Sequence, residues 1–167
     1  MGAPAAGILR RLGALLYDAI LLIALLFVAT LPWLPLTGGE AITPQASGWG
    51  AQLYRGWLLL VAFGYFGLSW TRGGQTLGMR AWRIRLERAD GGAPGWLDAL
   101  VRFSLGTAMA LLAGLGLWYL RSPGGSLPGL AAALLLLPPI ANLLWVARDA
   151  HGRSLQDLAS LTRVVRG

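Results

Sequence analysis

Residues 12–31 read LGALLYDAILLIALLFVATL, a stretch whose only charged side chain is Asp18. About 20 consecutive apolar residues in an α-helix are long enough to cross the hydrocarbon core of a bilayer. We therefore expect an integral membrane protein. A carboxylate inside such a stretch costs about 2.5–3.5 kcal/mol on insertion scales unless another group pairs with it. Asp18 is thus the first candidate for a functional or a structural buried charge.

The composition of the chain supports a membrane protein. Of its 167 residues, 56% are hydrophobic and 13% are charged, whereas soluble domains average about 25% charged residues. The chain has no cysteine and one histidine, which argues against disulfides, thiol catalysis and a metal site, and we expect no cofactor. In a membrane protein the net charge of +7 is expected to reflect topology and anionic lipid, not a nucleic-acid partner.

Three further apolar stretches, residues 53–71, 97–120 and 127–147, are also long enough to span a membrane. The predicted fold is an all-α bundle of four transmembrane helices in a single domain over residues 1–167. Pro138 and Pro139 should kink or locally break the fourth helix. The short turn at residues 122–126 predicts an antiparallel hairpin of the third and fourth helices.

The arginines predict the orientation of these spans. All fourteen basic residues are arginine, a composition typical of a GC-rich, bacterial genome. They concentrate before the first span, in loop 72–96 and after the fourth span, and loop 32–52 carries none. The positive-inside rule therefore places both termini and loop 72–96 in the cytoplasm, at a bacterial inner membrane.

The loop at residues 72–96 has a pattern of its own. Apolar and charged residues alternate over residues 82–87 (WRIRLE), which is typical of a strand with one apolar face, and the sequence DGG at residues 90–92 supplies a turn. We expect a short hairpin or flap whose apolar face enters the membrane interface. Arg83, Arg85 and Arg88 would then contact lipid phosphates. The alternative is a disordered basic loop.

The buried charges allow several pairings. Arg11 and Asp18 lie seven residues apart on one helical face, but both side chains lean toward the N-terminus, so we expect no direct salt bridge. Arg102 lies at a similar depth in the third span, which predicts an Asp18–Arg102 pair. Asp98, four residues before Arg102, competes for the same guanidinium group.

The tail combines a helix start with another carboxylate. Ser154 and Asp157 have the spacing of a capping box, and Leu155, Leu158 and Leu161 follow at three-residue spacing. This pattern predicts a short amphipathic helix near the C-terminus. Asp157 is either an ordinary helix-capping carboxylate or a group beside the mouth of the bundle that gates or relays protons.

Three motifs, taken in order, resemble the RDD family of bacterial membrane proteins. They are the arginine and aspartate at positions 11 and 18, the segment GQTLGMR at residues 74–80, and the segment LQDL at residues 155–158. The positions that carry this resemblance in the first span and the central loop are Arg11, Asp18, Gly74, Thr76, Gly78 and Arg80. Arg102 and Asp157 occupy further positions where the family has its charged residues.

The chain also departs from the family pattern. Met79 stands where a lysine is common, and Arg83 and Leu161 stand where glycine is common. The resemblance implies a membrane protein for which transport has been proposed, and some family members look like cation/proton antiporters.

Two functions remain open at this point. The first is transport of ions or small solutes, in which Asp18 exchanges a proton for a monovalent cation, in a homo-oligomer because four spans make a thin pathway. The alternative is a non-catalytic assembly, lipid-contact or regulatory protein, in which Arg11, Asp18, Arg102 and Asp157 lock the helices together. An enzyme is not expected, because the sequence offers no nucleophile–base pair and no phosphate-binding loop. No internal inverted repeat is evident.

Overall fold

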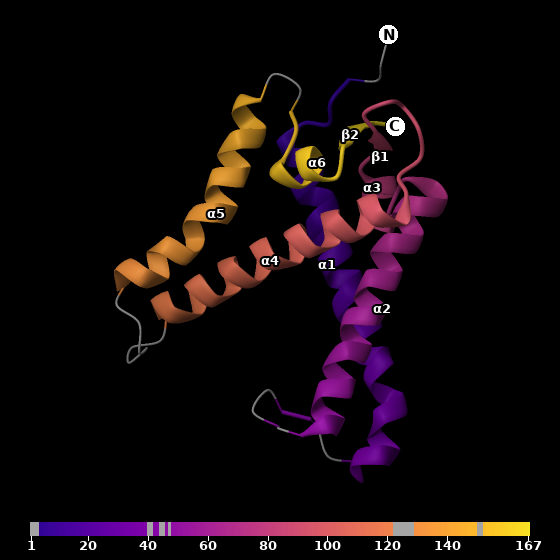
Figure 1. The fold of residues 1–167 in the computed structure, drawn as a ribbon, viewed down its shortest axis with the longest axis vertical. Coiled ribbons are helices and arrows are strands. Elements are labelled where there is room, and N and C mark those ends of the chain that lie inside the picture. The colour runs from indigo at the N-terminus through magenta and orange to yellow at the C-terminus, as the bar shows by residue number, and fades with distance from the viewer. Residues whose placement is uncertain (1–3, 40–41, 44–45, 47, 122–128, 150–151) are drawn as a thin grey trace.

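The computed structural model describes residues 4–39, 42–43, 46, 48–121, 129–149 and 152–167. The described part of the chain is mostly helical, at 74% of its residues, and Figure 1 shows the order of its elements. The helices are α1 (Ile8–Thr30), the 3-10 helix η1 (Leu31–Thr37), α2 (Trp49–Gly73), α3 (Leu77–Ala81), α4 (Trp96–Arg121), α5 (Gly129–Arg148) and α6 (Leu155–Ala159). The strands are β1 (Ile84–Arg88) and β2 (Thr162–Arg166).

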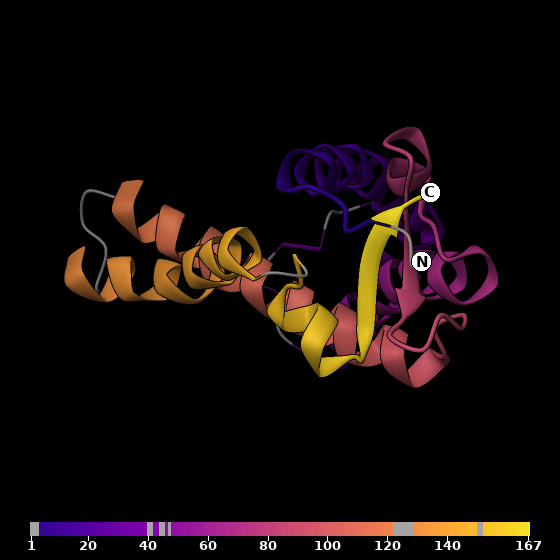
Figure 2. The same cartoon turned by 90° about the horizontal axis from the view of Figure 1, so that it is seen from above.

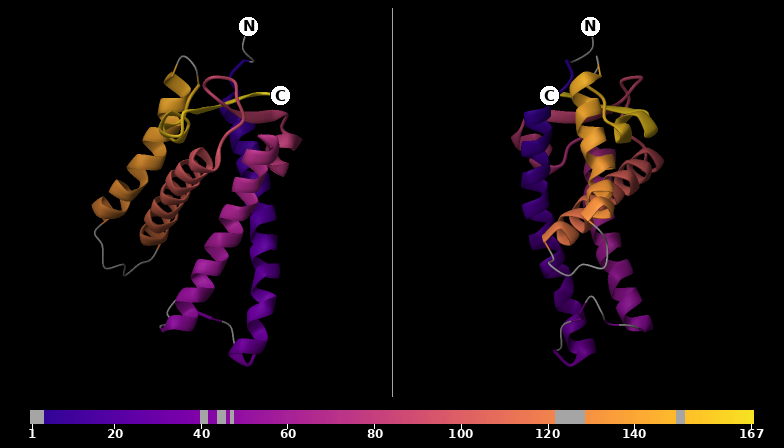
Figure 3. Two further views of the ribbon diagram at one scale, coloured as in Figure 1. Left: turned by 45° about the vertical axis from the view of Figure 1, so that its right-hand side comes forward. Right: turned by 90° about the vertical axis from the view of Figure 1, so that its left-hand side faces the viewer.

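The long helices form two hairpins that meet at one end of the molecule. Helices α1 and α2 run side by side, and α4 and α5 form the second pair (Figures 1 and 3). The four short elements α3, β1, α6 and β2 gather where the hairpins meet, and we call them the head. Away from the head the two hairpins diverge, as Figure 3 shows. The two hairpins are therefore joined near this end of the molecule, through the head and through direct packing of α2 against α4.

Three helical segments of the described chain are long and apolar enough to cross a membrane: residues 8–37, α4 and α5. They contain most of the expected first, third and fourth spans. The expected second span, residues 53–71, lies inside α2, which is 25 residues long. Arg55 and several glycine and aromatic residues dilute the hydropathy of α2, so that α2 is not among the three. The turn at residues 122–126 lies outside the described residues.

Helix α5 continues through Pro138 and Pro139, so the expected local break does not occur. Proline lacks an N–H and removes a hydrogen bond from the helix. A helix in an apolar surrounding keeps its remaining backbone hydrogen bonds, because a broken helix would expose unsatisfied polar groups.

The predicted strand is present, but its partner is not a local hairpin. Strand β1 pairs antiparallel with β2 from the tail, with Leu86 opposite Val164. The prediction of an apolar face in the membrane interface is also wrong, since Ile84 and Leu86 are 1% and 2% exposed and pack inside the head. A paired strand satisfies its backbone and lets its apolar side chains bury against protein.

Helix α6 begins with the capping box that the sequence predicts. The Ser154 side chain accepts a hydrogen bond from the backbone of Asp157, and the Asp157 side chain accepts one from the backbone of Ser154. The helix has only five residues, because Leu161 takes a left-handed conformation with φ of 50° and turns the chain into β2. Leu161 is therefore 63% exposed and does not continue an apolar stripe.

The best-buried apolar side chains lie where the head meets the hairpins. This core consists of Ala6, Ala14, Trp70, Met79, Ile84, Leu86, Ala99 and Val164. Phe63, Phe66 and Phe103 pack against it from α2 and α4. Large side chains farther along the helices, such as Ile23 and Phe27 on α1, are about 70% exposed, as expected for surfaces that face lipid.

Candidate functional site

Two arginines from different hairpins meet at Asp157. Arg11 lies on α1 and its Nη1 atom is 2.6 Å from Asp157 Oδ2. Arg102 lies on α4 and its Nη1 atom donates to Asp157 Oδ1. The carboxylate is fully buried, and each arginine side chain is 14% exposed. One carboxylate thus bridges α1, α4 and α6.

Further hydrogen bonds fix this cluster to the head. The backbone N–H of Ser154 donates to Asp157 Oδ2 at 2.8 Å, as part of the capping box. Arg11 also donates to the carbonyl of Gly152 at 2.6 Å, and Arg102 donates to the hydroxyl of Thr162 at 3.2 Å. Asp157 is therefore both a helix-capping residue and the centre of a buried ionic cluster.

The charge of Asp157 follows from these neighbours. Burial by itself raises the pKa of this carboxyl, because the charged form loses its hydration. The guanidinium groups of Arg102 and Arg11, together with the Ser154 N–H, outweigh burial and hold the pKa of Asp157 below its usual range. The carboxylate stays ionised at neutral pH, so proton relay through it is disfavoured.

Asp18 lies in a second cluster, whose donors are all uncharged. The Tyr65 hydroxyl donates to Asp18 Oδ1 at 2.7 Å, the Thr76 hydroxyl donates to Oδ2 at 2.5 Å, and the Gly78 N–H donates to Oδ1 at 2.8 Å. The side chain does not face hydrocarbon, because Asp18 is only 5% exposed beneath the head. It thereby ties α1 to α2 and α3.

Local sequence explains why α3 can approach Asp18 so closely. Thr76 caps the start of α3, and its hydroxyl accepts the N–H of Met79 at 3.1 Å while it donates to Asp18. A Cβ atom on Gly78 would lie 2.3 Å from the carbonyl oxygen of Ala14. Only glycine fits this contact between α1 and α3.

The predicted Asp18–Arg102 pair is wrong. Arg102 bonds to Asp157, whereas Asp18 is surrounded by donors from α2 and α3. Similar depth along the helices does not produce an Asp18–Arg102 pair, because the head lies over Asp18 and supplies donors to it. Asp98 does not take Arg102 either; it lies 3.6 Å from Arg88 and accepts the N–H of Gly95.

Comparison with known proteins identifies the family. A model of the RDD family matches residues 5–160. The chain belongs to the RDD family. No curated protein and no solved structure was found to match it.

The other predicted positions of this RDD protein are spread over the head. Gly74 ends α2 with φ of 64°, and a Cβ there would lie 2.7 Å from the Leu86 carbonyl oxygen. Arg80 and Arg83 are exposed. Arg85 lies 3.3 Å from Glu87. Arg88 is paired with Asp98, so it is not wholly available to lipid as predicted.

Sequence reasoning missed several polar contacts of this RDD protein. Tyr65 donates a hydrogen bond to Asp18, although it lies in an apolar stretch that predicts only a span. A hydroxyl group inside such a stretch is nevertheless a signal of a buried polar contact. Glu87 lies 2.8 Å from Arg163 and so links the two strands. Asn142 was not missed: a lone amide in the apolar sequence of α5 predicts an interhelical hydrogen bond, and it does donate to Gln156 at 3.0 Å and accept the Leu155 N–H at 2.8 Å, which holds the start of α6.

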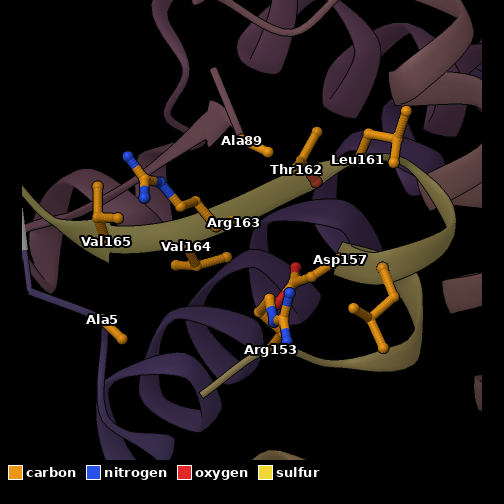
Figure 4. Close-up of a pocket in the computed structure, with 10 residues that line it drawn as sticks. Ala5, Ala89, Arg153, Asp157, Leu161, Thr162, Arg163, Val164 and Val165 are labelled. Atoms are coloured by element: carbon orange, nitrogen blue, oxygen red, sulfur yellow. The ribbon is translucent and has the colours of Figure 1, made fainter. Parts of the chain in front are cut away.

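A cavity of about 310 Å³ opens in the head of the RDD protein beside β2 and α6. Figure 4 shows most of its lining, which is largely apolar and includes Ala5, Ala89, Leu161 and Val165. Arg163 and Arg153 also line it, but Glu87 and Asp149 already bind these guanidinium groups. Within the described residues, no group of His, Cys, Asp and Glu side chains has the makings of a metal site.

Proposed function

We propose that this RDD protein is a non-catalytic protein of a bacterial inner membrane, with four spans and a cytoplasmic head. The assignment of α2 as the remaining span is supported by its length and by its position beside α1 (Figure 3). The cytoplasmic placement of both termini and the head is supported by the arginines, because they concentrate before the first span, in loop 72–96 and after the fourth span, whereas loop 32–52 has none.

The role we propose for the buried charges is structural. The observation that carries this proposal is the full set of uncharged donors around Asp18, which are Tyr65, Thr76 and the Gly78 N–H. A buried charge with good partners holds its surroundings in one arrangement, and removing a partner is costly. Asp157 with its two arginines does the same between the hairpins.

Exposed arginines make the head suitable for contact with anionic lipid. Arg72, Arg80, Arg83, Arg85 and Arg166 are all exposed on or beside the head. Each basic residue near an anionic surface contributes about 1 kcal/mol of attraction. A rigid, basic head at the cytoplasmic surface is thus a platform for lipid contact or for assembly with other membrane proteins.

Transport is the second candidate, in which Asp18 exchanges a proton for a monovalent cation within a homo-oligomer. It is favoured by one observation, an ionisable group within the apolar helix α1. This candidate needs Asp18 to release its donors during a cycle, whereas the structural role needs them to stay.

The two candidates are separated by proton flux in proteoliposomes, measured for the wild type and for Asp18→Asn under a Na⁺ or K⁺ gradient. The structural role predicts no cation-driven flux in either protein and a lower unfolding midpoint for the variant. Cation-driven flux in the wild type that disappears in a folded variant would establish transport instead. Thermal unfolding of both proteins in the same lipid gives the folding control.

A further inference from the structure

The order of elements occurs twice along the chain. Residues 8–88 contain two long helices, a five-residue helix and a five-residue strand (α1, α2, α3, β1). Apart from η1, which lies between α1 and α2, the described residues of 96–166 contain the same succession (α4, α5, α6, β2). We call these segments the first and the second unit. Both units run in the same direction relative to the head (Figure 1), so they are not an inverted pair.

The backbone of the head repeats in detail at a spacing of 78 residues. Gly74 and Gly152 are both left-handed, with φ of 64° and 61°. Thr76 and Ser154 are both N-caps whose hydroxyl accepts the N–H three residues later. The short helices are followed by a left-handed residue that is not glycine, Arg83 at 53° and Leu161 at 50°. Such residues are uncommon, so their recurrence is not explained by chance.

The sheet relates the two units by an approximate two-fold axis. Leu86 pairs with Val164, and these residues occupy the same position in their units. The segments before α1 and α4 add a reciprocal pair of bonds. Arg166 of the second unit donates its N–H to Pro4 at 2.9 Å, and Arg88 of the first unit donates its N–H to Gly92 at 2.9 Å. Each strand thus binds the segment that leads into the other unit.

We infer that the chain is a tandem duplication of one membrane unit, and that its two copies pair in the head about an axis along the long helices. Parallel repeats of this kind are known among membrane proteins. The inference assigns a counterpart to the Asp18 site. This counterpart lies in the second unit, where α4 meets α6.

The residues of the counterpart follow from the two helix starts. Gly7 and Gly95 each precede a first helix and accept the N–H four residues on, which aligns Asp18 with Gly106. In the head, Gly78 aligns with Gln156. In the first unit the carboxylate is on the long helix and the glycine is on the short one. In the second unit the two positions are exchanged: the polar side chain, Gln156, is on the short helix and the glycine, Gly106, is on the long one. A Cβ on Gly106 would lie 4.0 Å from Gln156 Nε2.

The second long helix supplies a polar partner in both units. Tyr65 on α2 donates to Asp18, and Asn142 on α5 donates to Gln156. Gly106, Gln156 and Asn142 are therefore positioning residues that do for α6 what Asp18, Gly78 and Tyr65 do for α3.

A double-mutant cycle on the full chain tests this equivalence. Gly106→Asp and Gln156→Gly are introduced singly and together, and unfolding midpoints are measured by tryptophan fluorescence in detergent. The double variant would place a carboxylate against a glycine N–H and the Ser154 hydroxyl, as in the first unit. We therefore expect its unfolding midpoint to be higher than the value obtained by adding the two single changes to the wild-type midpoint. Thr107→Asp combined with Gln156→Gly is the control, because Thr107 lines a different surface between α2 and α4. Additive effects at position 106 would overturn the equivalence.

A second measurement does not depend on a new buried charge. Arg83→Gly and Leu161→Gly relieve the same left-handed backbone in the two units, and each should raise the unfolding midpoint by about 2–4 °C. Ala81→Gly and Ala159→Gly are the matched controls, two residues earlier in each unit, and both should lower it. A rise at only one of the two left-handed positions would contradict the repeated backbone.

Discussion

Asp18 is buried beneath the head and Asp157 within it, but Asp18 accepts hydrogen bonds from uncharged groups whereas Asp157 lies between two guanidinium groups. The donors of Asp18 come from the same unit, so this site fastens α3 to its own hairpin. Arg11 and Arg102 come from different units, so Asp157 holds the two hairpins together. The comparison teaches that uncharged donors serve local packing here, while the ionic cluster serves the junction.

The largest effect is expected from Asp157→Ala. Two arginines that are 14% exposed would lose their shared carboxylate, and breaking a buried ion pair in this way costs about 3–5 kcal/mol. The free energy of unfolding, from a denaturant titration in mixed micelles, measures the loss.

Asp90→Ala is the control for this prediction. The Asp90 side chain is 68% exposed and lies 3.7 Å from Arg88, and exposed pairs contribute about 1 kcal/mol or less. Equal losses from the two substitutions would remove the distinction between a junction and a surface pair.

Acidification should weaken the same junction. The folded-state pKa of Asp157 is held down by Arg102 and Arg11 against the effect of burial, so its stabilising contribution is complete above the unfolded pKa of about 3.9. It is lost as the pH falls through the lower, folded value. The thermal midpoint, measured from pH 7 to pH 2.5, should therefore decrease once the pH is below about 4. The decrease should be less steep for Asp157→Ala than for the wild type. Parallel curves for the two proteins would argue against this assignment.

A smaller effect is expected at the Asp18 site from Tyr65→Phe. This change removes one of three donors, and a hydrogen bond to a charged group contributes about 1.5–3 kcal/mol. The remaining Thr76 and Gly78 bonds should keep the loss near 1.5 kcal/mol in the free energy of unfolding. Tyr17→Phe, beside Asp18 but 46% exposed, should change it by no more than about 0.5 kcal/mol. A larger loss in the free energy of unfolding for Tyr17→Phe than for Tyr65→Phe would contradict Tyr65 as the tyrosine that donates to Asp18.

The parts of the fold that depend on hydropathy could be predicted. Spans 12–31, 97–120 and 127–147 lie largely within α1 with η1, α4 and α5 because long apolar runs have few alternatives to a membrane helix. The alternation at residues 82–87 also predicted β1. The same alternation gave no indication of the partner strand, since pairing depends on the whole chain.

The errors arose where backbone conformation or tertiary contacts decide. The three-residue spacing predicts Leu161 in a helical stripe, but its left-handed backbone leads into a new strand, and leucine carries no signal for that conformation. Depth along the helices predicts an Asp18–Arg102 pair, but depth alone takes no account of the donors that the head brings to Asp18. The repeat did leave a sequence signal: the pairs Thr76/Ser154, Leu77/Leu155 and Arg85/Arg163 recur at one spacing.

The pairing of β1 with β2 has a consequence for how the protein is made. Strand β1 leaves the ribosome before α4 and α5, yet its partner follows both of them in the chain. The first hairpin is therefore complete before the second, while β1 keeps an unpaired edge until β2 has been made. Closing the head is therefore a late step in the synthesis of the chain.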